Sequence, residues 1–405
     1  MKRVRMLTGW LGLGMLAFCA PADGQPLTEG EAVRIGLEVA AWREWADTSM
    51  DEARRKTSAT GLLENPEFEF ADESLDLPGG NTDRFYWLRQ PLDLTGRNSL
   101  ARESARASEG VRAADIDMTR RQRATAIRAA FYRVIRLRSE SGAMETWRAR
   151  LAELSQAVTE RVRVGDASRF DHLRIERETA LLDGRLAATR AELNSTRDRL
   201  FGILDTSPRS LAGHLLPPEP PARETVMTAL RAHPELGALQ AGAEADRLAA
   251  RSAAREVWPE VTLGLGFREL EDGPLSENGA VFSLGVEVPL FDRGRQRRAA
   301  AEAGAGAKSA EAALAVARLE ADARALLDEL AMRRSAALKM RMALEGETNS
   351  LPEIAEAAYS AGELDVMNLL DAWQTELDLQ LQAIELEYAA RVAAIELMQL
   401  TGESQ

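Results

Sequence analysis

The sequence predicts a mostly α-helical fold with a smaller β component, in which a pattern of helix, strand, strand, long helix and helix occurs twice. Three observations support this: motifs repeat after about 198 residues, two long stretches lack proline, and two pairs of segments alternate apolar with polar residues. Hydrophobic residues reach 45% but aromatic residues only 5%, because alanine and leucine interleave with arginine and glutamate. That balance is typical of long packed helices.

The duplication rests on four motif pairs with nearly constant offsets. By residue number, 65–68 resembles 258–261, 90–93 resembles 288–291, 96–97 resembles 294–295, and 164–166 resembles 361–363. Prolines cluster between the two copies and break regular structure there. We therefore expect a first repeat over 23–207, a proline-rich linker over 208–224 and a second repeat over 225–405.

The strands are clearest in the second repeat. Apolar residues occupy every second position over 261–267 and again over 282–288, with polar residues and glycine between them. Period two with one apolar face predicts strands that have lipid or core on one side and water on the other. In the first repeat the alternation is weaker. The aromatic cluster at 85–88 there suits a membrane interface, although a buried hairpin would look similar.

Long helices follow the predicted strands. No proline occurs between Gly96 and Pro208, which predicts a helix of about 70 residues from Gly96 to Gly165, some 100 Å long. Later helices keep a seven-residue rhythm that predicts coiled-coil packing. Its members are Leu186, Leu193 and Leu200 in the first repeat and Leu379, Leu386, Ala393 and Leu400 in the second.

The first 22 residues have the pattern of an export signal. A basic start precedes an apolar run, residues 7–19, that is too short to cross a bilayer, and Ala20 and Ala22 provide small residues for cleavage. A rival interpretation makes Cys19 a lipid-anchored N-terminus, although Phe18 stands where a lipidation motif has Gly or Ala. No later stretch has about 20 apolar residues, which argues against a helical membrane protein.

Composition also excludes several classes of function. A net charge of −13 is the wrong sign for a protein that binds nucleic acid. One cysteine allows no cysteine-based metal site, and His172, His214 and His233 lack metal-ligand spacing. No nucleophile motif occurs either. We expect no enzyme activity, no cofactor and no bound metal.

Four amphipathic strands cannot close a membrane barrel, because closure without open edges starts at about eight strands. The strands must therefore be pooled between copies of the chain. Two copies give eight strands and three give twelve, and only the larger barrel leaves an open lumen.

The pattern resembles the TolC-like outer membrane efflux protein family. The segments that carry this resemblance are His233-Pro234-Glu235-Leu236, Trp258-Pro259, residues 288–294, residues 359–364 and residues 369–372. The resemblance implies a homotrimer with a twelve-stranded outer-membrane barrel and a helical tunnel across the periplasm. It also implies docking onto an inner-membrane pump of the RND type through a periplasmic adaptor protein.

Within the family, residues 291–295 and 165–171 look most like the CzcC/CusC-type heavy-metal efflux branch, which implies heavy-metal cations as substrates. Drug efflux and type I secretion are alternatives with the same fold. A periplasmic coiled-coil adaptor or scaffold is the alternative from another class.

The resemblance also implies a periplasmic gate, because family members carry acidic residues a few positions after the tip glycine. The matching positions are Asn368 and Asp371; Asn368 departs from the acidic pattern, and Asp365 could partly replace it. Alternatively, Asp371 caps or pairs within the helix bundle. The first-repeat counterparts are Asp171 and Arg174, which we expect to offer an ion-pair partner across the closed tip.

Two predicted hairpin tips are candidates for adaptor contact, again by resemblance. They are Val164-Gly165-Asp166 and Ala361-Gly362-Glu363. A helix-hairpin loop that needs a left-handed glycine would have the same sequence, and both interpretations can hold at once.

Overall fold

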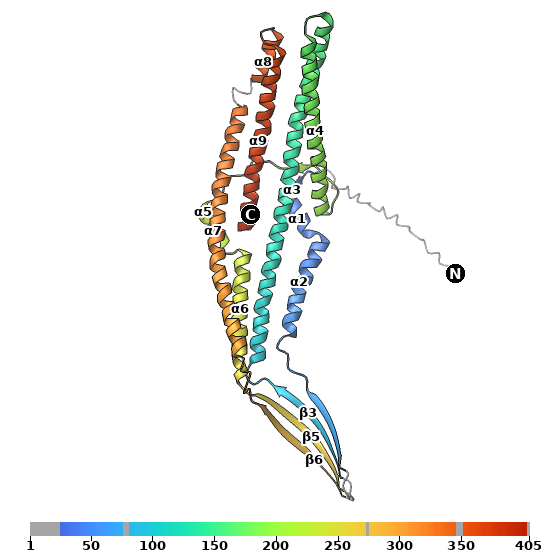
Figure 1. The fold of residues 1–405 in the computed structure, drawn as a ribbon, viewed down its shortest axis with the longest axis vertical. Coiled ribbons are helices and arrows are strands. Elements are labelled where there is room, and N and C mark those ends of the chain that lie inside the picture. The colour runs from blue at the N-terminus through green and yellow to red at the C-terminus, as the bar shows by residue number, and fades with distance from the viewer. Residues whose placement is uncertain (1–24, 76–80, 273–274, 346–350, 403–405) are drawn as a thin grey trace, which may run out of the picture.

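A computed structural model describes residues 25–75, 81–272, 275–345 and 351–402. The predicted export signal and Cys19 lie outside these residues. Figure 1 shows an elongated molecule, with helices along the long axis and one sheet at the end opposite two helical hairpins. No helix in the described ranges combines the length and the apolar character needed to cross a membrane.

The elements follow the predicted duplicated order. The first repeat contains β1 (Leu27–Thr28), α1 (Glu29–Glu38), α2 (Ala40–Ala59), β2 (Glu67–Leu75), β3 (Asn81–Leu92), α3 (Arg97–Val164) and α4 (Arg169–Leu204). The short strand β4 (Leu211–Ala212) lies in the predicted linker. The elements after it are α5 (Arg223–Leu230), α6 (Pro234–Ala254), a 3-10 turn (Arg255–Val257), β5 (Glu260–Asp272), β6 (Leu275–Glu287), α7 (Arg295–Glu345), α8 (Leu351–Ser360) and α9 (Val366–Thr401).

Glycines set both ends of α3, which spans 68 residues and confirms the predicted long helix. Gly96 has φ 72° and Gly165 has φ 85°, a left-handed conformation that glycine adopts without steric cost. After Gly165 the chain reverses into α4, where Ser168 and Asp171 form a capping box. The predicted hairpin tip is therefore present.

The large sheet has the strand order β2-β3-β5-β6, and each neighbouring pair is antiparallel. The β3–β5 pair joins the two repeats. The helices keep the same sideways order, since α2 packs on α3, α3 on α6, and α6 on α7. One lateral edge of the molecule is therefore formed by β2 and α2, and the other by β6 and α7.

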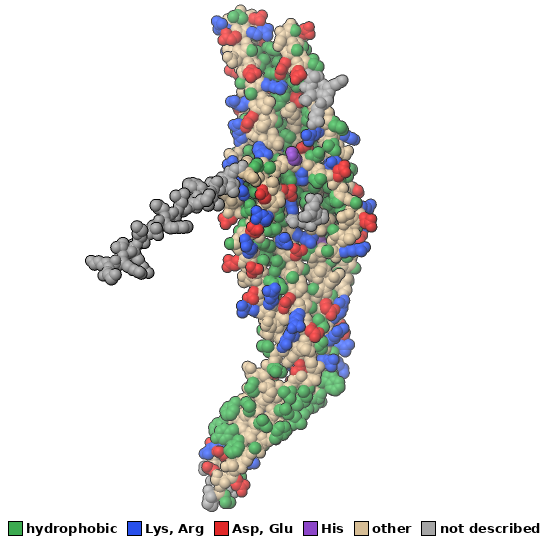
Figure 2. Space-filling view, turned by 180° about the vertical axis from the view of Figure 1, so that it is seen from behind, with side chains coloured by type: hydrophobic (Ala, Val, Ile, Leu, Met, Phe, Trp, Pro, Cys, Tyr) green, Lys and Arg blue, Asp and Glu red, His purple; other side chains and the backbone are tan. Residues whose placement is uncertain are grey.

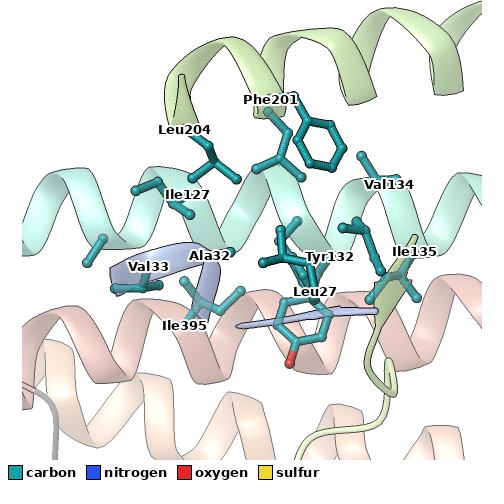
Figure 3. Close-up of a cluster of buried hydrophobic side chains, with 14 of the residues drawn as sticks. Leu27, Ala32, Val33, Ile127, Tyr132, Val134, Ile135, Phe201, Leu204 and Ile395 are labelled. Atoms are coloured by element: carbon teal, nitrogen blue, oxygen red, sulfur yellow. The ribbon is translucent and has the colours of Figure 1, made fainter. Parts of the chain in front are cut away.

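Three apolar clusters line the helical part. The first surrounds Phe131 and joins α1, α3, α4 and α9 with the short strands β1 and β4 (Figure 3). A second lies toward the tips and contains Trp147 and Trp373, whose ring centroids are 5.7 Å apart. The third joins α5, α6, α7 and α9. Burial along the whole length is what fixes the helices side by side.

The linker is more ordered than the prolines predicted. Leu211 of β4 pairs in parallel with Leu27 of β1, and α5 begins at Arg223, inside the predicted linker. The buried guanidinium of Arg391 donates to the carbonyl oxygens of residues 214, 215 and 216 at 2.7, 3.0 and 2.8 Å. Proline removes backbone donors, so a side chain from α9 satisfies the carbonyls of this segment instead.

The seven-residue rhythm is confirmed in α4, where Leu186 and Leu200 are buried and Leu193 packs against the core. In α9 the predicted register is wrong. A different heptad series, 369, 376, 383, 390 and 397, is buried there, and Ala393 alone of the predicted positions is fully buried. The buried residues of α9 include other leucines (369, 370, 377 and 397) together with several alanines, so leucine spacing alone does not give the contact face.

Candidate channel surfaces

The sheet has one exposed apolar face. Residues that lie directly across all four strands form rows on it, and one row is Phe68, Leu88, Leu265 and Phe282. These four side chains are 67%, 49%, 63% and 67% exposed. Figure 2 shows hydrophobic side chains gathered over the sheet, in contrast to the mixed charges of the helical part. Such a large apolar surface, on a sheet that no other layer covers among the described residues, indicates contact with lipid or with another chain.

The apolar band is shorter than the full apolar band of an outer-membrane barrel. It runs from Val261 to Phe267, six residue steps or about 20 Å along the strand, against a band about 25 Å tall in such a barrel. Beyond it, toward the strand hairpins, the same face becomes charged. There Arg84 pairs with Asp72 at 3.2 Å and with Glu271 at 3.6 Å.

The opposite face of the sheet is polar. Its ion pairs are Arg89–Glu69 and Arg268–Asp83. Trp87 lies on the same face and covers Gly266 on the neighbouring strand. A Cβ added at Gly266 would meet the Trp87 ring at 2.7 Å. One apolar and one polar face, with unpaired edges at β2 and β6, is the arrangement expected of a piece of a membrane barrel.

The predicted tip residues lie together at the far end of the helical part. Val164, Gly165 and Asp166 are exposed in the α3–α4 hairpin, and Ala361, Gly362 and Glu363 are exposed in the α8–α9 hairpin. Arg161 connects the hairpins, because it pairs with Asp166 at 3.1 Å and lies 5.7 Å from the centroid of the Tyr359 ring. The tips therefore form one exposed surface.

The three gate candidates lie on the first turns of α9, next to this surface, and differ in their contacts. Asp365 is the N-cap of α9 and accepts from the backbone N–H of Asn368 at 2.8 Å and from its side-chain amide at 2.9 Å. Asp371 is exposed and has no hydrogen bond or ion pair within the described chain. The capping role that was the alternative for Asp371 thus belongs to Asp365.

Arg174 and Asp171 do not reach the gate candidates within one chain. Arg174 pairs with Glu178 on its own helix at 2.8 Å, and Asp171 is used in the α4 capping box. Among the described residues, no group of three or more histidine, cysteine or acidic side chains is placed to hold a metal ion.

Two features of these surfaces have no signal in the sequence. The exposed side chains Leu94, Leu290 and Phe291 lie where the strands meet the long helices, in turns without any periodic signal. Glu356 of α8 accepts from Arg150 of α3 at 3.4 Å and from the Trp373 indole of α9 at 3.1 Å, and so joins three helices near the tips. No spacing in the sequence indicates a contact between residues that are so distant in sequence.

Comparisons with known proteins agree with this geometry. Residues 226–403 match the family model described as outer membrane efflux protein. A comparison with curated protein sequences found no match.

Solved structures share the fold along nearly the whole chain. The outer membrane protein VceC from Vibrio cholerae is 14% identical with a TM-score of 0.73, covering 92% of this chain and 96% of VceC. CusC is 13% identical with a TM-score of 0.76, covering 93% and 92%. The MtrE outer membrane channel of Neisseria gonorrhoeae is 15% identical with a TM-score of 0.73, covering 92% and 88%.

Residues 226–403 therefore match the family of outer membrane efflux proteins, and the chain as a whole shares the fold of the solved channel proteins VceC, CusC and MtrE.

Proposed function

We propose that three copies of this chain form the passive exit duct of a tripartite efflux system. Each copy contributes four strands to a twelve-stranded barrel, and the helices continue the barrel as a periplasmic tunnel. A pump of the RND type in the inner membrane feeds this duct through a periplasmic adaptor protein. The observation that carries the proposal is the four-stranded sheet with one apolar face, one polar face and two open edges.

The lateral order of the elements fits an assembly in which neighbouring copies meet through the edges of their sheets. β2 and α2 form one edge while β6 and α7 form the other, so neighbouring copies would pair strands and pack helices along the same seam. Pairing removes the free N–H and C=O groups that an open sheet edge cannot satisfy in lipid. The polar face carries Phe85, Trp87 and Arg89, bulky side chains that need the wide lumen of a twelve-stranded barrel.

We propose heavy-metal cations as the substrate. Support comes from the resemblance of residues 291–295 and 165–171 to the heavy-metal branch, and from the exposed, unpaired Asp371 near the tips. Three copies of this carboxylate around one mouth would raise the local concentration of cations. Drug efflux and type I secretion use the same fold and are the alternatives.

The substrate class is tested by growth of a strain that lacks this chain. The panel contains zinc, cobalt, cadmium, copper and silver salts together with dyes, detergents and antibiotics. Sensitivity restricted to metals, restored by the intact gene, is the expected result. Sensitivity only to organic compounds would reject the metal proposal and leave the duct intact.

Adaptor contact is proposed for the two tips, because they expose Val164, Asp166 and Glu363 on one surface. Site-specific crosslinkers at Val164 and Glu363 should capture the adaptor in cells, and a crosslinker at Arg223 on α5 is the control. Fractionation addresses the alternative of a periplasmic scaffold. Heat-modifiable trimers in the outer-membrane fraction are expected, and a soluble periplasmic species would reject the duct.

A further inference from the structure

The ends of β5 and β6 meet the helices in a rigid corner. Glu260 at the start of β5 pairs with Glu287 at the end of β6, so residues 251–258 and 288–298 lie at the same end of the sheet. Gly294 has φ 68°, and its Cα lies so near the Ala253 carbonyl that a side chain there would clash. We call these two segments the junction corner.

The acidic side chains of the junction corner are already neutralised. Arg297 pairs with Glu256 and, at 2.8 Å, with Asp292. Hydrogen bonds from the Gly294 backbone N–H and the Arg297 side chain lower the pKa of Asp292 below its usual range, so it stays ionised. At the start of β5, Glu260 pairs with Arg97 at 2.7 Å.

Four exposed arginines are then left without an acidic partner. Arg251, Arg255, Arg293 and Arg295 make no ion pair among the residues that the structure describes. Of these, Arg293 donates to the Pro289 carbonyl at 3.2 Å. The junction corner is therefore basic, although the whole chain has a net charge of −13.

Exposed apolar side chains lie next to these arginines. Phe291 is 101% exposed, and Leu290 and Trp258 are 64% and 59% exposed. Leu290 and Phe291 follow β6, and Trp258 precedes β5. The corner therefore continues the apolar face of these strands toward the helices. Aromatic and apolar side chains beside basic ones are typical of the boundary between lipid tails and headgroups.

We propose that the junction corner binds anionic phospholipid in the membrane leaflet on the helical side of the sheet. Phe291 and Leu290 lie among the acyl chains, while Arg251, Arg255 and Arg295 contact headgroup phosphates. This inference rests on the proposed function, because that function places the apolar face of the sheet in the outer membrane.

Continuity with the apolar face favours lipid as the occupant. The proposed function places that face in the membrane, and an anionic headgroup there neutralises the unpaired arginines of the corner. The edge that a neighbouring copy would bring here, that of β2 and α2, carries Arg54 without an acidic partner among the described residues but also the exposed Glu64 and Glu67. A second copy is therefore the competing occupant that the experiments below must exclude.

The test measures binding of phosphatidylglycerol to purified full-length trimers in neutral detergent, by native mass spectrometry. The variant is Arg251→Gln/Arg255→Gln/Arg295→Gln. Its matched control, Arg177→Gln/Arg199→Gln/Arg231→Gln, removes three exposed arginines that also lack an ion pair but lie on other parts of the chain. We expect at least tenfold weaker binding in the corner variant and parent-like binding in the control, since each basic residue near an anionic surface contributes about fivefold.

Equal affinity in the corner variant and the parent would overturn the proposal, as would an equal loss in the control. Competition by free glycerol phosphate as strong as that by the lipid would overturn it too, because the site would then bind phosphate rather than a membrane. Channel conductance is measured on the same preparations. A parent protein that shows no conductance would reject the proposed duct, and this result is distinct from a failure of lipid binding.

A second measurement needs no arginine substitution. Phe291→Cys is labelled with an environment-sensitive fluorophore in nanodiscs that contain nitroxide lipids, and the unsubstituted chain treated with the same fluorophore gives the background. Quenching by nitroxide is expected. Protection from both nitroxide and an aqueous quencher would show that a neighbouring copy covers Phe291, and would overturn the proposal.

Discussion

Trp87 lies across Gly266, so that an added Cβ at Gly266 would meet the indole ring at 2.7 Å. The two residues are directly paired, Trp87 on β3 of the first repeat and Gly266 on β5 of the second. The β3–β5 pair is the junction between the repeats within the sheet. Packing of the large Trp87 ring over a residue without a side chain fixes the register of the β3–β5 pair, because a slip of one residue would move Trp87 to the other face of the sheet.

This relationship predicts that Gly266→Val weakens the protein. Valine would push against the Trp87 ring and the Tyr86 backbone, and such overpacking typically costs about 1–3 kcal/mol. We expect less heat-modifiable trimer and a lower midpoint of trimer dissociation. Gly279→Val is the control, since Gly279 lies on the polar face of β6 with no atom within 4 Å of its added Cβ. Equal effects of both substitutions would contradict the proposed role of Trp87.

Asp371→Asn should reduce cation selectivity. The carboxylate is exposed and unpaired in the described chain, so its charge acts on the mouth and not on helix stability. We expect the ratio of cation to anion permeability to fall about twofold or more, with an unchanged melting temperature. Glu396→Gln, an exposed acid at the opposite end of α9, should leave the ratio unchanged. An unaltered ratio in Asp371→Asn would reject the gate role.

Arg391→Met should destabilise the fold near the linker. The substitution keeps most of the apolar volume but leaves the carbonyl oxygens of His214, Leu215 and Leu216 without their buried donor. It also removes the contact of the guanidinium with the Tyr132 ring, 4.3 Å away. The cost should be about 3 kcal/mol or more, seen as a fall of several degrees in melting temperature. Substitution of the exposed Arg199 by Met is the control. Equal melting temperatures of the two variants would show that the hydrogen bonds of Arg391 do not stabilise the linker.

The chain should also lose stability when the pH falls below about 6.5, partly through His233. Burial, with a smaller contribution from the Arg121 charge, lowers the pKa of His233 below the value of 6.5. The unfolded chain therefore binds a proton more readily, and stability falls as the pH drops from 6.5 through the folded-state pKa. Protonation also removes the Nδ1 acceptor that caps α6 through the Glu235 backbone N–H, at 3.3 Å.

The check compares melting temperatures at pH 7.5 and pH 5.5. His233→Asn, which keeps a neutral capping acceptor, should show a smaller acid-induced fall than the parent. His214→Asn replaces an exposed histidine and should behave like the parent. A fall in His233→Asn as large as in the parent would exclude His233 as the source.

The sequence predicts the long elements well because their signals are local. Left-handed glycines at 96 and 165 bound α3 within one residue of the prediction, and strict alternation located β5 and β6. Tip glycines at 165 and 362 also adopt the predicted left-handed conformation. In each case a residue's own backbone preference or its neighbours two positions away decide the outcome.

What the sequence could not predict depends on contacts between distant residues. The pairing of Leu27 with Leu211 and the burial of Arg391 arise only once α9 lies beside the linker. The register of α9 was wrong because alanine and glutamate, not leucine, occupy much of its buried series. Amphipathicity gives little help in such helices, since in the proposed tunnel both sides of the helical wall would face water.

Single-channel recording of the purified full-length protein in a planar lipid bilayer decides whether three copies form a duct. We expect discrete, uniform conductance steps from a preparation that is trimeric by mass, because three open sheets close into one water-filled barrel. A membrane-inserted trimer without conductance at any voltage, or a species that stays monomeric and does not insert, would contradict it.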